Sequence, residues 1–235
     1  MAAENRRQEP AEREFTGRRI LLLRAQTPQR RVFAQSLSRL ADRMGGRLQA
    51  AEETEKIRGD DLVFLFGMIR ESGRLAYREL QSVLDGLKRL EQEPPKAAAL
   101  LTGTEVYGKR YGTPRAVREE EMGYVSHLLS EDTGAFCMRT AEHMAARFAK
   151  EKGLPVKILR VFSFPETPGG EDGMERLAEQ AVWGLLYGTD GEAYNLPWEP
   201  GAKKEETGER SALSPVPIRP DFGKWEQLRE ERRLS

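Results

Sequence analysis

The sequence predicts an α/β fold in which a mainly parallel sheet carries helices on both faces. Short apolar runs of strand length alternate along the chain with longer segments whose apolar residues recur every three or four positions. Glycine or proline follows several of the helical segments and marks their ends. Strands that alternate with helices require crossover connections, and such connections build a parallel, doubly wound sheet.

Four strands and four helices follow from these patterns. DDLVFLFG, at 60–67, is a continuous apolar run typical of a parallel strand buried on both faces. Gly45 and Gly153 each follow a helical stretch and predict its end. We assign no element to the brief RLQAAEE segment that begins at Arg47. We expect strands at 19–23, 61–66, 97–102 and 156–162, and helices at 32–44, 75–90, 140–152 and 174–187.

One principal domain is expected, with polar ends. Residues 1–14 are nearly all charged or small and predict a mobile leader. The main domain is assigned to 15–187, and a reduced C-terminal region with a polar tail to 188–235. Within that region, 199–220 is rich in Pro, Gly, Glu and Lys and indicates a linker or loop. DFGKWEQLREERR then predicts a last short helix with Trp225 and Leu228 on one face.

Charge and cysteine content exclude several classes of protein. The 235 residues include 38 basic and 38 acidic side chains, which argues against a general nucleic-acid or anionic-membrane binder. The single cysteine cannot form an internal disulfide, and no apolar run approaches the roughly 20 residues that span a bilayer. The opening residues lack the apolar core of a signal peptide, so we expect a cytoplasmic protein.

Several phrases, in a particular order, resemble a known family. They are GRRILLL, DDLVFLFG, ALLTGTEVYG at 99–108, TAEHMAARFAKEKGLPVKILRVF at 140–162, GTDGEAYNL at 188–196 and, more weakly, PIRPDFGK at 217–224. Together they resemble extended short-chain dehydrogenases/reductases of the NAD-dependent epimerase/dehydratase type. The resemblance implies a Rossmann-like fold, an NAD(P) cofactor and a nucleotide-sugar substrate. It also implies dimers that pair through two helices per subunit, which correspond here to 74–90 and 140–152.

The turn after the first strand departs from that family. Dinucleotide sites of this kind use glycines so that the backbone can approach the pyrophosphate. RAQTPQRRV, at 24–32, contains no glycine, and Pro28 removes a backbone donor. Two interpretations stay open: a solvated turn, or an anion site rebuilt on Arg24, Arg30 or Arg31. We expect no cofactor to bind in the usual way, although NAD(P) is implied if the family function is retained.

A deletion is the second departure from the family pattern. Only about a dozen residues separate Leu48 from Leu62. The resemblance implies further strand–helix units at this point, including the acidic residue that contacts the ribose.

The third departure concerns proton transfer. The resemblance implies a Tyr and a Lys four residues apart on one helix, with a Ser or Thr nearby. Counted from the helix phrase, these positions fall on Gly134 and Met138, neither of which can transfer a proton. Thr102, Thr104 and Tyr107 remain weak catalytic candidates. Threonines at a strand end more often cap backbone groups.

Other patterns that suggest chemistry have simpler explanations. His127 and His143 show no metal-ligand spacing, and we expect no metal and a surface position for His143. Cys137 is either a thiolate near a helix start or, as we favour, a buried thiol. The acidic run 119–121 is interpreted as a solvated loop, because adjacent residues point their side chains in different directions.

Three functional hypotheses survive. The first is a pseudoenzyme that serves as a homodimer, as the partner of an intact homologue, or as a sensor of a nucleotide-like ligand. The second is a nucleotide-sugar enzyme with an unusual site at the carboxyl ends of the strands. That site would gather Thr102, Thr104, Glu105, Tyr107 and Arg160. The third is a structural subunit completed by another chain.

Overall fold

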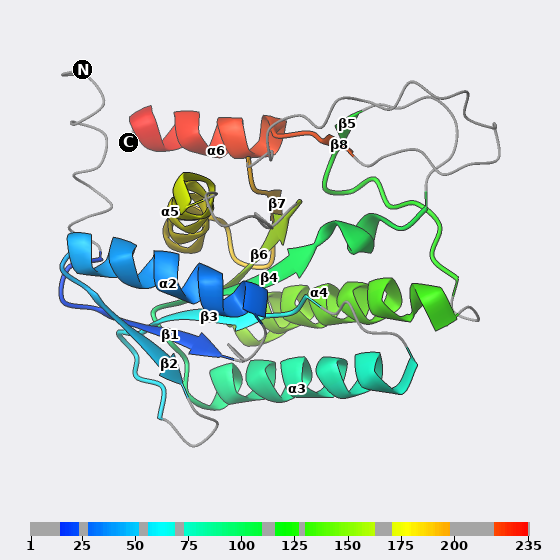
Figure 1. Cartoon of the computed structure of the whole chain (residues 1–235), viewed down its shortest axis with the longest axis horizontal. Coiled ribbons are helices and arrows are strands. Elements are labelled where there is room, and N and C mark those ends of the chain that lie inside the picture. Colours follow the sequence, from blue (N-terminus) through cyan, green and yellow to red (C-terminus); the bar gives the residue numbers. More distant parts are fainter. Residues whose placement is uncertain are drawn as a thin grey trace.

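A six-stranded parallel sheet forms the centre of the molecule (Figure 1). The computed structural model describes residues 15–23, 28–51, 56–68, 73–109, 116–126, 130–162, 171–197 and 219–234. The strands are β1 (Arg19–Leu23), β2 (Arg47–Ala51), β3 (Leu62–Phe66), β4 (Ala97–Gly103), β6 (Val156–Val161) and β7 (Ala193–Asn195). Their order is β2-β1-β3-β4-β6-β7, and every neighbouring pair is parallel.

Helices cover both faces of this sheet (Figure 1). On one face lie α2 (Pro28–Arg43), α5 (Glu171–Tyr187) and α6 (Gly223–Leu234), and on the other lie α3 (Gly73–Gln92) and α4 (Thr133–Lys152). Side chains that alternate along a strand feed the two layers, because successive residues point to opposite faces. Ile20 and Leu22 therefore join the core under α2 and α5, while Leu21 joins the core under α3 and α4.

The predicted fold class is confirmed: the chain forms a Rossmann-like, doubly wound sheet. The four predicted strands and four predicted helices are all present, with ends that differ by a few residues in most cases. Gly45 and Gly153 adopt left-handed backbone conformations, with φ of 71° and 65°, at the ends of their helices. The glycine stops were therefore correctly predicted.

Three local features differ from what the sequence analysis assigned. The unassigned RLQAAEE segment contains β2, which pairs with β1 along five residues. Helix α4 begins at Thr133, seven residues before the predicted start at Thr140, and the added turns bury Cys137 and Met138. The predicted linker at 199–220 ends in β8 (Arg219–Pro220), which pairs in parallel with β5 (Ala116–Val117). Its residues 199–218 and the predicted leader 1–14 lie outside the described residues.

Helix α6 has the face that the sequence predicted. Trp225 and Leu228 are both buried, and Trp225 is only 1 % exposed. The indole ring of Trp225 lies 5.1 Å from that of Trp183 on α5 and 6.4 Å from the ring of Tyr194 on β7, measured between ring centroids. This aromatic group holds the C-terminal helix against the main sheet. None of the helices in the described ranges is long and apolar enough to cross a membrane.

We predict that Trp225→Ala destabilises the protein by about 3–5 kcal/mol, the usual cost of removing a buried indole. Urea unfolding followed by far-ultraviolet circular dichroism measures this loss without relying on tryptophan fluorescence. Glu226→Ala, at the exposed neighbouring position, is the matched control and should change the unfolding free energy by less than about 0.5 kcal/mol. Equal stability of the two variants would show that α6 does not depend on this contact.

Candidate functional site

Buried polar side chains gather at the carboxyl ends of three adjacent strands. Strand pairing places Thr102 on β4 beside Arg160 on β6, and Arg160 beside Asn195 on β7. Tyr107 belongs to the short helix η2 (Thr104–Tyr107) that follows β4, and Glu142 comes from α4. With Glu119, these residues form what we call the carboxyl-edge cluster: Thr102, Tyr107, Glu119, Glu142, Arg160 and Asn195.

An ion pair between Glu142 and Arg160 is the centre of the cluster. The guanidinium donates from Nε to Oε1 of Glu142 at 3.0 Å and from Nη2 to Oε2 at 2.7 Å. The Thr102 hydroxyl donates to Oε1 of Glu142 at 2.6 Å. Burial alone would lower the pKa of Arg160, but the adjacent Glu142 carboxylate outweighs it and raises the pKa. Arg160 therefore stays charged, and its guanidinium forms a buried ion pair with the Glu142 carboxylate.

Tyr107 is held as a neutral phenol. Its hydroxyl donates to Oδ1 of Asn195 at 2.5 Å and accepts a bond from Nη1 of Arg160 at 2.9 Å. Burial raises the pKa of Tyr107 to about 12, although Arg160 and Asn195 act in the opposite direction. A phenol with this pKa is not a proton acceptor at neutral pH.

Asn195 and Glu119 attach the C-terminal region to the sheet. The backbone N–H of Asn195 donates to Oε1 of Glu119 at 2.8 Å, and its side-chain amide donates to the carbonyls of Val117 and Asp221 at 3.2 and 3.0 Å. The Glu119 carbonyl accepts from Nη1 of Arg160 at 2.7 Å. The interpretation of 119–121 as a solvated loop was therefore wrong for Glu119, which is 4 % exposed. Burial raises the pKa of this carboxyl group.

The chain resembles solved structures of one kind. It shares 16 % identity and a TM-score of 0.55 with a UDP-glucuronic acid 4-epimerase from Bacillus cereus in complex with NAD, and covers 76 % of each chain. A dTDP-glucose 4,6-dehydratase from Streptomyces venezuelae, with NAD bound, shares 14 % identity and a TM-score of 0.54, and the match covers 76 % of this chain and 75 % of that one. A GDP-L-fucose synthetase from Naegleria fowleri shares 11 % identity and a TM-score of 0.55, and the match covers 76 % of each chain.

This chain has the same Rossmann-like fold as these enzymes. At these identities the likeness establishes the fold alone. No protein-family model matches the sequence, and a search of curated proteins finds no match.

The turn that the resemblance assigns to the dinucleotide lies mostly outside the described residues, which stop at Leu23 and resume at Pro28. Strand β1 ends at Leu23 and α2 begins with Pro28, so the first helical residue offers no N–H to a phosphate. Arg24 lies outside the described residues, and only the backbone of Arg30 is described, in the first turn of α2. Arg31 is exposed. The arginine anion site stays a prediction.

The two positions that the resemblance assigns to the Tyr/Lys pair lie in the first two turns of α4. Gly134 and Met138 are both buried. Met138 packs with Val106, Tyr107 and Cys137, so its surroundings are apolar. The expected burial of Cys137 is confirmed, and burial raises the pKa of its thiol, which disfavours a thiolate. The expected surface position of His143 is also confirmed, while His127 lies outside the described residues.

The weak catalytic candidates separate in the structure. Thr102 and Tyr107 lie in the carboxyl-edge cluster with Arg160, whereas Thr104 is half-buried beside it and Glu105 is exposed. Thr102 donates to a carboxylate, so the expectation that it caps a backbone group was wrong. The roles of Glu142, Asn195 and Glu119 were not predicted from the sequence. Glu142 and Asn195 lie inside the phrases that resemble the family, and this position was the sequence signal that could have identified them.

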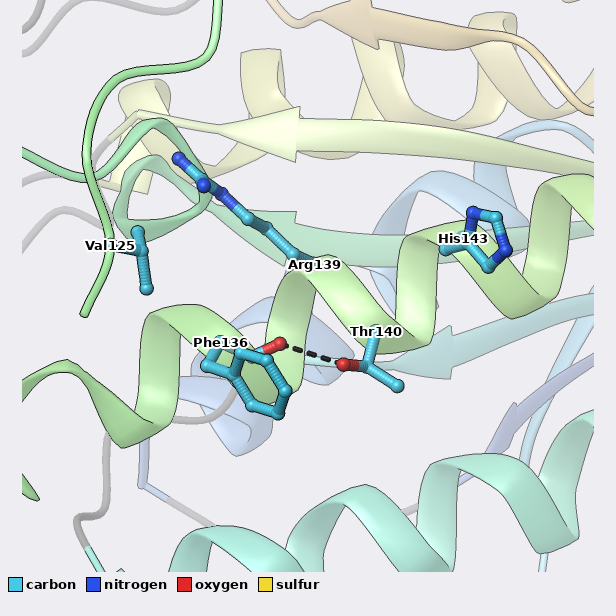
Figure 2. A pocket seen from close by; sticks show the side chains of 5 residues that line it. All are labelled: Val125, Phe136, Arg139, Thr140 and His143. Atoms are coloured by element: carbon cyan, nitrogen blue, oxygen red, sulfur yellow. Dashed lines mark hydrogen bonds between the residues drawn. The ribbon is translucent and has the colours of Figure 1, made fainter. Parts of the chain in front are cut away.

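A hollow of about 450 Å³ lies on the outer side of α4 (Figure 2). Its lining consists of Val125, Phe136, Arg139, Thr140 and His143. Thr140 donates to the carbonyl of Phe136 in its own helix, and the guanidinium of Arg139 donates to the carbonyls of Val106 and Gly123. Few polar groups are left to converge on a small ligand. In the described ranges, no group of three or more potential ligand residues is placed to hold a metal ion.

We predict that Glu142→Gln destabilises the protein by about 3–5 kcal/mol, because it leaves the Arg160 cation buried without an opposite charge. Urea unfolding at neutral pH measures the loss. Glu151→Gln, which removes the exposed partner of Arg147 from the same helix, should cost no more than about 1 kcal/mol. Similar losses of unfolding free energy in both variants would contradict a buried ion pair between Glu142 and Arg160.

The buried phenol gives a pH dependence at the alkaline end. The folded-state pKa of Tyr107, about 12, exceeds the ordinary value of 10.0, so the stabilising contribution is complete below pH 10 and is lost as the pH rises toward 12. In an ultraviolet absorbance titration, one of the six tyrosines should ionise last or only on unfolding. Tyr107→Phe should remove that phase. Tyr77→Phe, at an exposed position, should leave it in place.

Proposed function

We propose that this chain is a pseudoenzyme: a binding or partner subunit that keeps the epimerase/dehydratase fold without its oxidation–reduction chemistry. The observation that carries the proposal is the carboxyl-edge cluster. At the edge of a parallel sheet where ligands usually bind, Thr102, Tyr107, Glu142 and Arg160 are buried and bonded to one another.

The proton-transfer chemistry of the fold requires a group that can change its charge near neutral pH. Tyr107 has a pKa of about 12, and Glu142 is held by Arg160 and Thr102. The positions assigned by resemblance to the Tyr/Lys pair hold Gly134 and Met138. The loss of the acid–base pair and of the glycines at the first turn together supports a role in binding.

A nucleotide-sugar epimerase/dehydratase-type enzyme with an unusual active site is the second candidate. The similar solved structures include enzymes named for nucleotide sugars, two of them with NAD bound. Thr104 and Glu105 stand beside the carboxyl-edge cluster with partial or full exposure and would have to supply the chemistry.

The proposed partner is a second copy of this chain or an intact homologue. The family resemblance implies pairing through the helices at 74–90 and 140–152, but the apolar stripes of α3 and α4 are used inside the molecule. Val83, Leu87, Leu90 and Ala145 are fully buried in the core that covers the sheet, and Leu80, Met144 and Phe148 pack against it. The fully buried side chains of these stripes are therefore not available to a partner.

Calorimetric titration with NAD, NADH, NADP and NADPH tests the pseudoenzyme proposal. We expect no saturable heat at micromolar concentrations, because the first turn lacks glycine and begins its helix with Pro28. An epimerase that binds NAD, titrated in the same way, serves as the positive control.

Micromolar binding that is lost in the Arg30→Ala and Arg31→Ala double variant, but kept in Arg39→Ala on the same helix, would contradict this expectation. It would show a rebuilt dinucleotide turn and favour the enzyme. A saturable heat with a nucleotide alone, without turnover, would instead support the role of a ligand sensor.

A further inference from the structure

Strand β2 forms one outer end of the six-stranded sheet (Figure 1). Among the strands that the structure describes, β2 pairs with β1 alone, in parallel, along the five residues from Arg47 to Ala51. A strand in this position presents unpaired backbone groups on its outer side, and such an edge is a template for another strand. The described part of β2 contains neither proline nor lysine, which commonly protect such edges.

One hydrogen bond fixes which backbone groups point outward. The N–H of Arg47 donates to the carbonyl of Arg18 at 3.0 Å, so the backbone groups of Arg47 point toward β1. Because successive residues of a strand alternate, Gln49 and Ala51 share that direction. Leu48 and Ala50 consequently direct their N–H and C=O groups to the outer edge.

This arrangement is complementary to itself. When two β2 strands pair antiparallel about Gln49, Leu48 of one copy stands opposite Ala50 of the other. Opposed residues that both face the partner exchange two hydrogen bonds. The two Leu48–Ala50 pairs therefore form four such bonds around a two-fold axis, and the two Gln49 residues meet at its centre.

The side chains and charges also fit an antiparallel second copy. Arg47, the single charged residue of β2, stands opposite Ala51 of the other copy, whereas a parallel arrangement would place the two Arg47 side chains together. Arg47 and Gln49 are exposed, and Oε1 of Gln49 accepts a hydrogen bond from Nη1 of Arg19 at 3.4 Å on the same face. Leu48 points to the opposite face and packs against the core that includes α2.

We propose that two copies of this chain associate through their β2 edges and form one continuous sheet across the two-fold axis. The inference rests on the self-association part of the proposed function and adds the surface through which the two copies would meet. It does not depend on whether the chain binds a dinucleotide, so the calorimetric titration and the experiments below can fail independently.

Sedimentation of the full chain over a range of concentrations is the first test. We expect a monomer–dimer equilibrium for the natural sequence and a shift of at least tenfold toward monomer in both Gln49→Lys and Gln49→Glu, since each places like charges opposite one another. An equal mixture of the two variants should recover the dimer. A chain that stays monomeric at hundreds of micromolar, or dimers that neither variant weakens, would overturn the proposal.

Cysteine cross-linking then tests the register. In the proposed pairing the two Gln49 residues form a non-hydrogen-bonded pair with Cα atoms about 4.5 Å apart, within the range that a disulfide bridges. Gln49→Cys should therefore form a covalent dimer with the mild oxidant diamide. Arg47→Cys is the matched control, because its two copies lie about four residues, or roughly 14 Å, apart along the strands.

Cys137 is buried and should not interfere with this reaction. Rapid cross-linking of Gln49→Cys with little reaction of Arg47→Cys would support the pairing about Gln49. Equal cross-linking of the two variants, or none in Gln49→Cys, would overturn it.

Discussion

The buried ion pair between Glu142 and Arg160 is the interaction on which the rest of the structure depends. A charge removed from water is tolerated only when an opposite charge and further hydrogen bonds replace its hydration. Here the Glu142 carboxylate also accepts from Thr102, and the guanidinium also donates to Tyr107 and to the Glu119 carbonyl. Satisfying one pair of charges therefore links α4, two strands, η2 and the loop after β5.

The same requirement explains why the described polar groups at this edge of the sheet are bonded to one another. The carboxyl ends of parallel strands usually leave a crevice in which ligands bind. In this chain, Tyr107 and Asn195 complete the bonds around Arg160, and Asn195 then reaches the β5–β8 segment through Val117 and Asp221. Thr102, Tyr107, Glu142 and Arg160 are therefore parts of one buried hydrogen-bonded group. The aromatic contacts of Trp225 hold the C-terminal helix against α5 and β7.

Sequence reasoning succeeded where a short stretch carries its own signal. Strands β3 and β4 are continuous apolar runs, and a buried parallel strand needs nothing else. Strand β2 was missed because Arg47 and Gln49 interrupt its few apolar residues, and its pairing with β1 is decided by tertiary contacts. The start of α4 was missed although Asp132 is a residue type favoured before a helix; in the structure its carboxylate makes no side-chain cap and accepts from the backbone N–H of Ser126. Glu119 looked solvated because its partner Asn195 is 76 positions away.

Hydrogen–deuterium exchange of the full chain tests whether the carboxyl-edge cluster is a buried part of the scaffold. Peptides covering 101–107, 117–119 and 193–196 should exchange slowly, close to the rate set by global unfolding, because their amides are buried with the cluster. Addition of millimolar NAD or a uridine diphosphate sugar should leave those rates unchanged. Fast exchange in the free protein that becomes slow when either ligand is added would contradict the account and would identify this edge as a ligand-binding site.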